Sequence, residues 1–153
     1  MRASVGFIFF MLFLAGLAFV NLRGMKDASE SAITSAADLA GTAWRATHIG
    51  EMRLQDDTEI VIQFDSDTSV SGNSGCNRFF GDFEFVDDSL AIGPLGSTRM
   101  ACPEPANSFE FSFLQALDEA RSVTRVDSRL AMRDSKNVVV ARFTTASISD
   151  AEE

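Results

Sequence analysis

Few residues of this chain are able to carry chemistry, since it has one histidine, two cysteines and no tyrosine. A structural zinc site takes about four ligands, more than His48, Cys76 and Cys102 supply, and no Cys-x-x-Cys pair is present. We therefore expect no metal and no cofactor. A catalytic His48 would require a nucleophile and an orienting acid, and the many serines and aspartates single out neither. We expect His48 to be a strand residue near a surface edge.

Acidic residues form two adjacent pairs, Asp56-Asp57 and Asp87-Asp88, which invite comparison with the paired carboxylates of glycosidases. Both pairs lie among turn-forming residues, where adjacent acids are usually solvated. Residues 65–73, DSDTSVSGN, suggest a calcium loop but lack its glycine, and Cys76 replaces its final glutamate; a polar turn is the better interpretation. We predict no catalytic residue and no enzyme activity, and keep a small-barrel hydrolase using acidic residues as an alternative.

The two cysteines, Cys76 and Cys102, are separated by 25 residues. An even cysteine count favours a disulfide in an exported protein. Two buried thiols acting as small apolar groups, or a metal or redox role, are the alternatives. A disulfide requires Cα atoms within about 7 Å of one another, and it would stabilise the fold by about 3–4 kcal/mol on the chain-entropy model.

Charge excludes some partners. Beyond residue 20 the chain holds 12 basic and 22 acidic residues. Nucleic-acid binding requires a basic surface, and docking to anionic lipid requires a polybasic one. We therefore expect no nucleic-acid partner and no polybasic lipid contact.

The N-terminal segment gives a predicted location. Residues 3–22 are almost wholly apolar, and about 20 such residues span the hydrocarbon core of a bilayer. We expect residues 1–22 to be an uncleaved signal-anchor helix that holds the domain on the periplasmic side of the cell membrane. The alternative is a signal peptide cleaved after Ala18, which would release a periplasmic or secreted protein.

The remaining chain divides into three parts. Residues 23–38 are small and polar and predict a flexible tether. Residues 39–145 show strand alternation, in 60–64, 79–85, 90–92, 130–132 and 138–143, separated by turn residues such as 71–73. Residues 146–153 form an acidic tail.

One helix is predicted within the folded part, after Pro103 and Pro105, with Asn107 or Ser108 as its N-cap. Its apolar face consists of Phe109, Phe113, Ala116, Leu117 and Ala120. The predicted fold class is α+β: a small, curved antiparallel sheet, a barrel-like meander, packed against one α-helix and preceded by the N-terminal hydrophobic helix.

Several separated motifs of this part resemble the META domain, the HslJ-like family. They are a glycine-cysteine-asparagine turn, a glycine before an aromatic strand, a threonine-x-methionine-alanine-cysteine segment and a helical glutamate. In this sequence they fall on Gly75, Cys76, Asn77, Gly81, Thr98, Met100, Ala101, Cys102 and Glu110. An aspartate at position 82, near which the family often has an aromatic residue, is a departure that leaves the strand phase intact.

The resemblance implies a small, non-enzymatic envelope or secreted domain associated with heat-shock and antibiotic stress. We therefore expect a membrane-tethered or exported binding or stress-protection module, whose partner would be an unknown envelope protein or peptide. A peptide-binding or inhibitor-like domain acting through an exposed strand edge is a further hypothesis. For the motif residues, a structural role and a recognition surface both stay open.

Overall fold

The computed structural model describes residues 31–148, and the predicted anchor, residues 1–22, lies outside them. The helices are η1 (Ala36–Asp38, 3-10) and α1 (Ala106–Glu119). The strands are β1 (Ser31–Ile33), β2 (Thr42–Ile49), β3 (Met52–Arg53), β4 (Ile60–Phe64), β5 (Ser69–Ser74), β6 (Arg78–Val86), β7 (Ser89–Ser97), β8 (Ser122–Val126), β9 (Arg129–Arg133) and β10 (Val139–Ala146). None of the helices in this part of the chain has the length and hydropathy needed to cross a bilayer.

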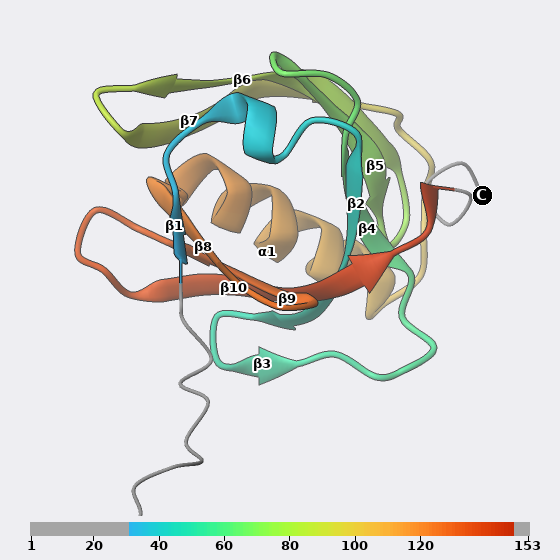
Figure 1. Cartoon of the computed structure of the whole chain (residues 1–153). Coiled ribbons are helices and arrows are strands. Elements are labelled where there is room, and N and C mark those ends of the chain that lie inside the picture. The colour runs from blue at the N-terminus through green and yellow to red at the C-terminus, as the bar shows by residue number, and fades with distance from the viewer. Residues whose placement is uncertain (1–30, 149–153) are drawn as a thin grey trace, which may run out of the picture.

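The strands form one antiparallel sheet in the order β1-β8-β9-β10-β2-β4-β5-β6-β7, and β3 pairs with β2 outside this path. Two meanders, β2 to β7 and β8 to β10, are joined where β10 pairs with β2. Figure 1 shows the sheet curling around α1, which lies in the concave interior. The predicted curved antiparallel sheet with one helix is therefore confirmed.

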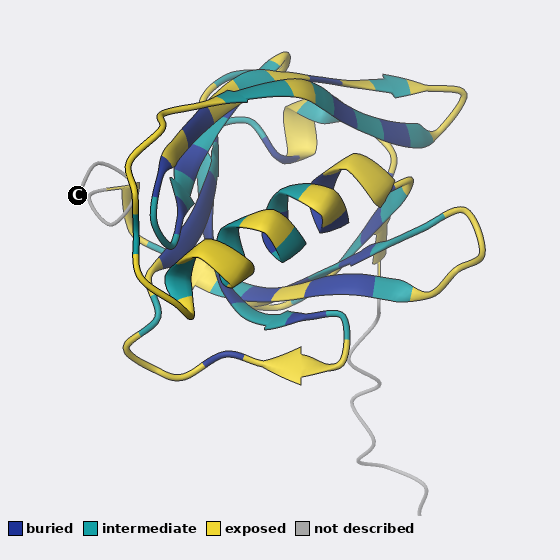
Figure 2. Cartoon of the chain, turned by 180° about the vertical axis from the view of Figure 1, so that it is seen from behind, coloured by how far each residue is buried: buried dark blue, intermediate teal, exposed yellow. Residues whose placement is uncertain are grey.

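The core lies between the helix and the inner face of the sheet. Figure 2 marks the buried stretches of α1 and of the strands around it. Strand alternation turns Ile60, Ile62 and Phe64 inward, and all three are fully buried. From the helix, the Phe113 ring meets Phe79 and Phe143 edge-on at centroid distances of 5.8 and 6.2 Å. The predicted apolar helix face therefore does pack against the sheet, with Phe109 partly buried at its end.

Two segments differ from the prediction. Residues 71–73, expected to be a turn, lie in the middle of β5, where β4 and β6 pair with them on both sides. Sheet pairing overrides the turn propensity here, and a Cβ at Gly72 would overlap the Val61 carbonyl oxygen. Within the expected tether, Ser31–Ile33 pair with β8 as β1, and Ile33 is buried.

The start of α1 also differs from the prediction. The helix begins at Ala106 with Pro105 in the N-cap position, so neither Asn107 nor Ser108 is the cap. Instead, the Glu104 carboxylate accepts hydrogen bonds from the Ser108 hydroxyl and, at 3.3 Å, from its backbone N–H. A carboxylate in this place satisfies an N–H that the first turn leaves unpaired.

Candidate functional site

The family motif forms one polar cluster around the buried side chain of Asn77. Its Oδ1 accepts hydrogen bonds from the Thr98 hydroxyl (2.8 Å) and from the Met100 N–H (2.7 Å). Its Nδ2 donates to Glu110 Oε2 at 2.7 Å. These four residues, which we call the Asn77 cluster, join the β5–β6 turn, the segment after β7 and helix α1.

The turn that carries Asn77 is closed by its own hydrogen bonds. Ser74 donates its hydroxyl (2.6 Å) and its backbone N–H (2.8 Å) to the Asn77 carbonyl oxygen. Gly75 adopts φ +95°, which a side chain would strain, and its N–H donates to Asn73 Oδ1 at 2.8 Å. The positive φ explains the glycine at position 75, and the bond to its N–H explains the asparagine at position 73.

The cysteine pair lies beside this cluster. The Sγ atoms of Cys76 and Cys102 are at bonding distance and their Cα atoms are 6.0 Å apart, so the geometric condition for a disulfide is met. The bond ties the Asn77 turn to the segment that leads into α1. It therefore acts between the same two parts of the chain as the hydrogen bonds of Asn77.

Two motif residues, Met100 and Gly81, do not bring a side chain to the Asn77 cluster. Met100 gives the cluster only its backbone, and its side chain is 60% exposed. Gly81 stands apart from the cluster, at the pairing of β6 with β7. A Cβ there would come within 2.8 Å of both the Pro94 carbonyl oxygen and Leu95 Cδ2. This glycine therefore permits the close approach of the two strands.

The other sequence candidates are not brought together. His48 lies on β2, where its Nδ1 is 3.1 Å from the Thr47 hydroxyl. Asp87 and Asp88 form the two-residue turn between β6 and β7, with φ of 49° and 62°, values typical of such hairpins. Within residues 31–148, no three histidine, cysteine or acidic side chains are placed to hold a metal ion.

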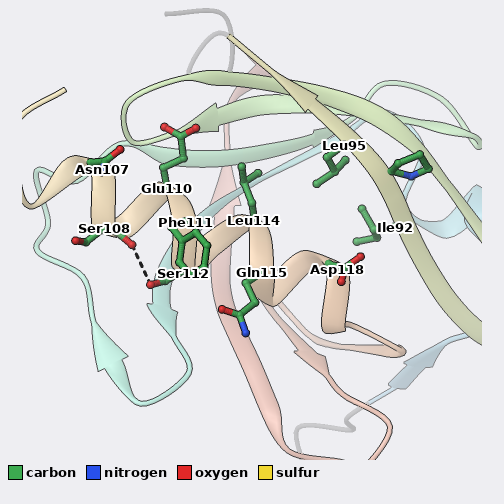
Figure 3. A pocket seen from close by; sticks show the side chains of 11 residues that line it. Ile92, Leu95, Asn107, Ser108, Glu110, Phe111, Ser112, Leu114, Gln115 and Asp118 are labelled. Carbon is green, nitrogen blue, oxygen red and sulfur yellow. Dashed lines mark hydrogen bonds between the residues drawn. The ribbon is translucent and has the colours of Figure 1, made fainter. Parts of the chain in front are cut away.

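A groove of about 830 Å³ runs between α1 and β7, and sequence reasoning missed it (Figure 3). Its apolar lining consists of Ile92, Pro94, Leu95, Phe111 and Leu114, and its polar lining includes Glu110 and Asp118. The Phe111 side chain is 71% exposed. The sequence signal that could have indicated the groove is Phe111, an aromatic residue outside the apolar face predicted for the helix.

Strand β7 is an edge of the sheet along this groove. Phe83 on β6 donates its N–H to the Thr68 carbonyl oxygen, on the side of β5. Phe83 and its partner Ile92 on β7 are therefore a non-hydrogen-bonded pair, and the N–H and C=O of Ile92 point away from β6. Leu90, two positions before Ile92, also points its N–H away from β6, and it donates to the Arg121 carbonyl oxygen. Ile92 and Leu95, which lie on either side of an irregularity in the β6–β7 register, both line the α1–β7 groove.

The molecule is thus a small half-barrel β-domain that encloses one helix, braced by a polar cluster and a cysteine pair. The family model described as "META domain" matches residues 37–147. The chain belongs to the META domain family. No curated protein sequence matches it.

Solved structures show the same fold. An NMR structure of a protein from Burkholderia xenovorans is 22% identical with a TM-score of 0.61, covering 73% of this chain and 86% of that one. A second NMR structure is 21% identical with a TM-score of 0.58, covering 73% and 95%. A DUF4847 family protein from Bacteroides vulgatus is 13% identical with a TM-score of 0.52, covering 69% and 93%. At these identities the likeness concerns the fold alone.

Proposed function

We propose that this META-domain protein is a non-catalytic, membrane-tethered envelope module that binds an extended peptide segment in the α1–β7 groove. The observation that carries the proposal is the edge of β7, which beyond Leu90 pairs with no strand of residues 31–148 other than β6, beside a groove whose lining is partly apolar. A bound strand would receive hydrogen bonds from the edge and would place alternate side chains between β7 and α1.

The lining of the groove indicates which peptides would fit. Phe111 and Leu114 from the helix and Leu95 from the strand provide apolar contacts. Asp118 at one end adds a negative charge to the rim. We therefore expect a segment with alternating apolar residues and a lysine or arginine at one end.

The location rests on the sequence. The apolar segment 3–22 supports a membrane anchor, and the cysteine pair fits an oxidising compartment such as the periplasm. An envelope-stress role follows as a working hypothesis, because a tethered peptide binder near the membrane would meet unfolded exported chains.

The test uses the full chain in a non-ionic detergent and a displayed library of random ten-residue peptides. Enriched sequences would be synthesised and titrated while backbone amide signals are followed by NMR. We expect shifts along β7 and α1. Phe111→Ala should weaken binding at least about fivefold, because it removes an exposed aromatic contact from the groove.

A matched control is Phe80→Ala. Phe80 is 61% exposed on β6 and does not line the groove. Equal losses for Phe80→Ala and Phe111→Ala, or no enriched peptide, would reject the peptide site. Mass spectrometry of the peptides after incubation addresses the hydrolase alternative: cleavage that one carboxylate substitution abolishes would show that the domain is an enzyme.

A further inference from the structure

Arginine is concentrated on one part of the sheet. Among the described strands acidic residues occur only in β6, and the four adjacent strands β8, β9, β10 and β2 have none. They hold five arginines, namely Arg45, Arg125, Arg129, Arg133 and Arg142, in a chain whose net charge is −9. The overall acidity of the chain therefore conceals a local basic surface.

The strand register gathers three of these arginines around a small residue. Ala131 on β9 is paired with Arg142 on β10, and Arg129 and Arg133 lie two positions before and after it on the same face of β9. Leu130 and Met132, which alternate with these residues, are buried in the core. The three arginines thus emerge on the outer face, opposite α1.

A hollow of about 430 Å³ lies over this alanine. It is lined by Arg129, Arg133 and Arg142, by His48, and by threonines of β2, β8 and β10, and none of its lining residues is acidic. We call it the Ala131 hollow. The short alanine side chain between long neighbours explains why space is left there.

The local environment favours an anion. Within residues 31–148, Arg142 Nη1 makes one long contact, 3.5 Å to the Gly50 carbonyl oxygen, at the outer limit of a hydrogen bond. Arg142 lies diagonally across from Arg129 and Arg133 on β9, and an anion placed among these positive charges would be attracted to them.

We propose that the Ala131 hollow binds a compact soluble anion that carries two or more carboxylate or phosphate groups. Arginine suits such ligands because its planar guanidinium donates paired hydrogen bonds to either group. The volume lies within the range of small-molecule sites, about 300–1,000 Å³. The site is on the outer face of the sheet, so this proposal is independent of the α1–β7 groove.

The test titrates the full chain in non-ionic detergent with sodium citrate and, separately, with sodium pyrophosphate, at ionic strength matched by sodium chloride. We expect saturable binding with amide shifts centred on β9 and β10. Arg142→Gln should weaken binding at least about fivefold and Arg129→Gln/Arg142→Gln more than about tenfold, because each change removes charge-assisted hydrogen bonds to the anion. Preference for citrate would assign a carboxylate ligand, and preference for pyrophosphate a phosphate ligand.

Two further variants make the result decisive. Arg99→Gln changes the net charge by the same amount as Arg142→Gln, but Arg99 lies outside the hollow. The Arg99→Gln variant should therefore bind the anion as the parent chain does. Ala131→Glu keeps every arginine and adds a competing carboxylate, so it should abolish binding in a chain whose thermal unfolding shows that it is folded. Equal losses for Arg99→Gln and Arg142→Gln, unsaturable shifts, or unchanged binding by the Ala131→Glu variant would overturn the proposal.

Discussion

Asn77 and Glu110 are separated by 33 positions, yet the Asn77 amide donates a 2.7 Å hydrogen bond to the Glu110 carboxylate. This bond connects the turn between β5 and β6 to the first half of α1. The other side of the same amide accepts from Thr98 and Met100. One buried side chain therefore connects the helix to the β5–β6 turn and to the segment after β7.

Asn77→Ala should lower the free energy of unfolding by about 2–4 kcal/mol, because it removes three hydrogen bonds of a buried side chain, one of them to a carboxylate. The measurement is urea unfolding of the full chain in non-ionic detergent. Asn107→Ala is the control, since Asn107 is on the helix surface and makes only a 3.4 Å contact to Glu104. A loss for Asn77→Ala no larger than the control would contradict the role assigned to the cluster.

A double-mutant cycle isolates the bond itself. The double variant Asn77→Ala/Glu110→Ala should cost about 1.5–3 kcal/mol less than the sum of the two single changes, because a hydrogen bond to a charged group contributes about that much. Glu110→Gln should cost less than Glu110→Ala, because the amide oxygen still accepts from Asn77. Additive losses would show that the two residues act separately.

How much of this could be foreseen differs from element to element. The apolar residues Ile60, Ile62 and Phe64 at every second position indicated a strand, and the spacing of Phe109 to Ala120 indicated a helix. In each case only one secondary structure brings the apolar residues onto one face. The polar motif residues indicated a turn. Their mutual contacts, however, join positions far apart in sequence, and no local pattern specifies that Asn77 meets Glu110.

Strand β5 and the α1–β7 groove show why the rest was not foreseeable. The sequence Ser71-Gly72-Asn73 has strong turn propensity, and only the neighbouring strands β4 and β6 hold it extended. The groove depends on the position of β7 relative to α1. That position is set by the curvature and pairing of the whole sheet, which no short stretch of sequence specifies. The Ala131 hollow likewise arises from strand register, since its arginines come from β9 and β10.

The contact between Glu104 and Ser108 predicts a pH effect at the start of α1. The Ser108 hydroxyl, with smaller contributions from Asn107 and the Ser108 N–H, lowers the pKa of Glu104 from its ordinary value. Because the folded pKa is depressed, the stabilisation is present above the ordinary glutamate pKa, about 4.3, and is lost as the pH falls through the lowered folded value.

Ser108→Ala should therefore raise the pKa of Glu104 toward its ordinary value, which the carboxyl carbon chemical shift measured against pH would report. Ser112→Ala is the matched control. Its hydroxyl donates to the Ser108 carbonyl oxygen at 2.9 Å rather than to Glu104. Identical titration of Glu104 in the parent chain and in Ser108→Ala would contradict the contact.

The cysteine pair gives the last prediction. Cys76 and Cys102 lie 26 positions apart, and closing a loop of this length restricts the unfolded chain. On the chain-entropy model the bond stabilises the fold by about 3–4 kcal/mol. Cys76→Ser/Cys102→Ser should therefore unfold at lower urea concentration, with a larger dependence of the unfolding free energy on urea, because its unfolded chain is more expanded.

The state of the pair in the cell is tested by alkylation and intact-mass measurement of the full chain recovered without reductant. We expect no alkylatable thiol before reduction and two afterwards, because an exported domain meets an oxidising environment. Two reactive thiols before reduction would contradict the bond. That outcome would also weaken the periplasmic orientation, and the Asn77 cluster would then hold the turn to the helix through its hydrogen bonds alone.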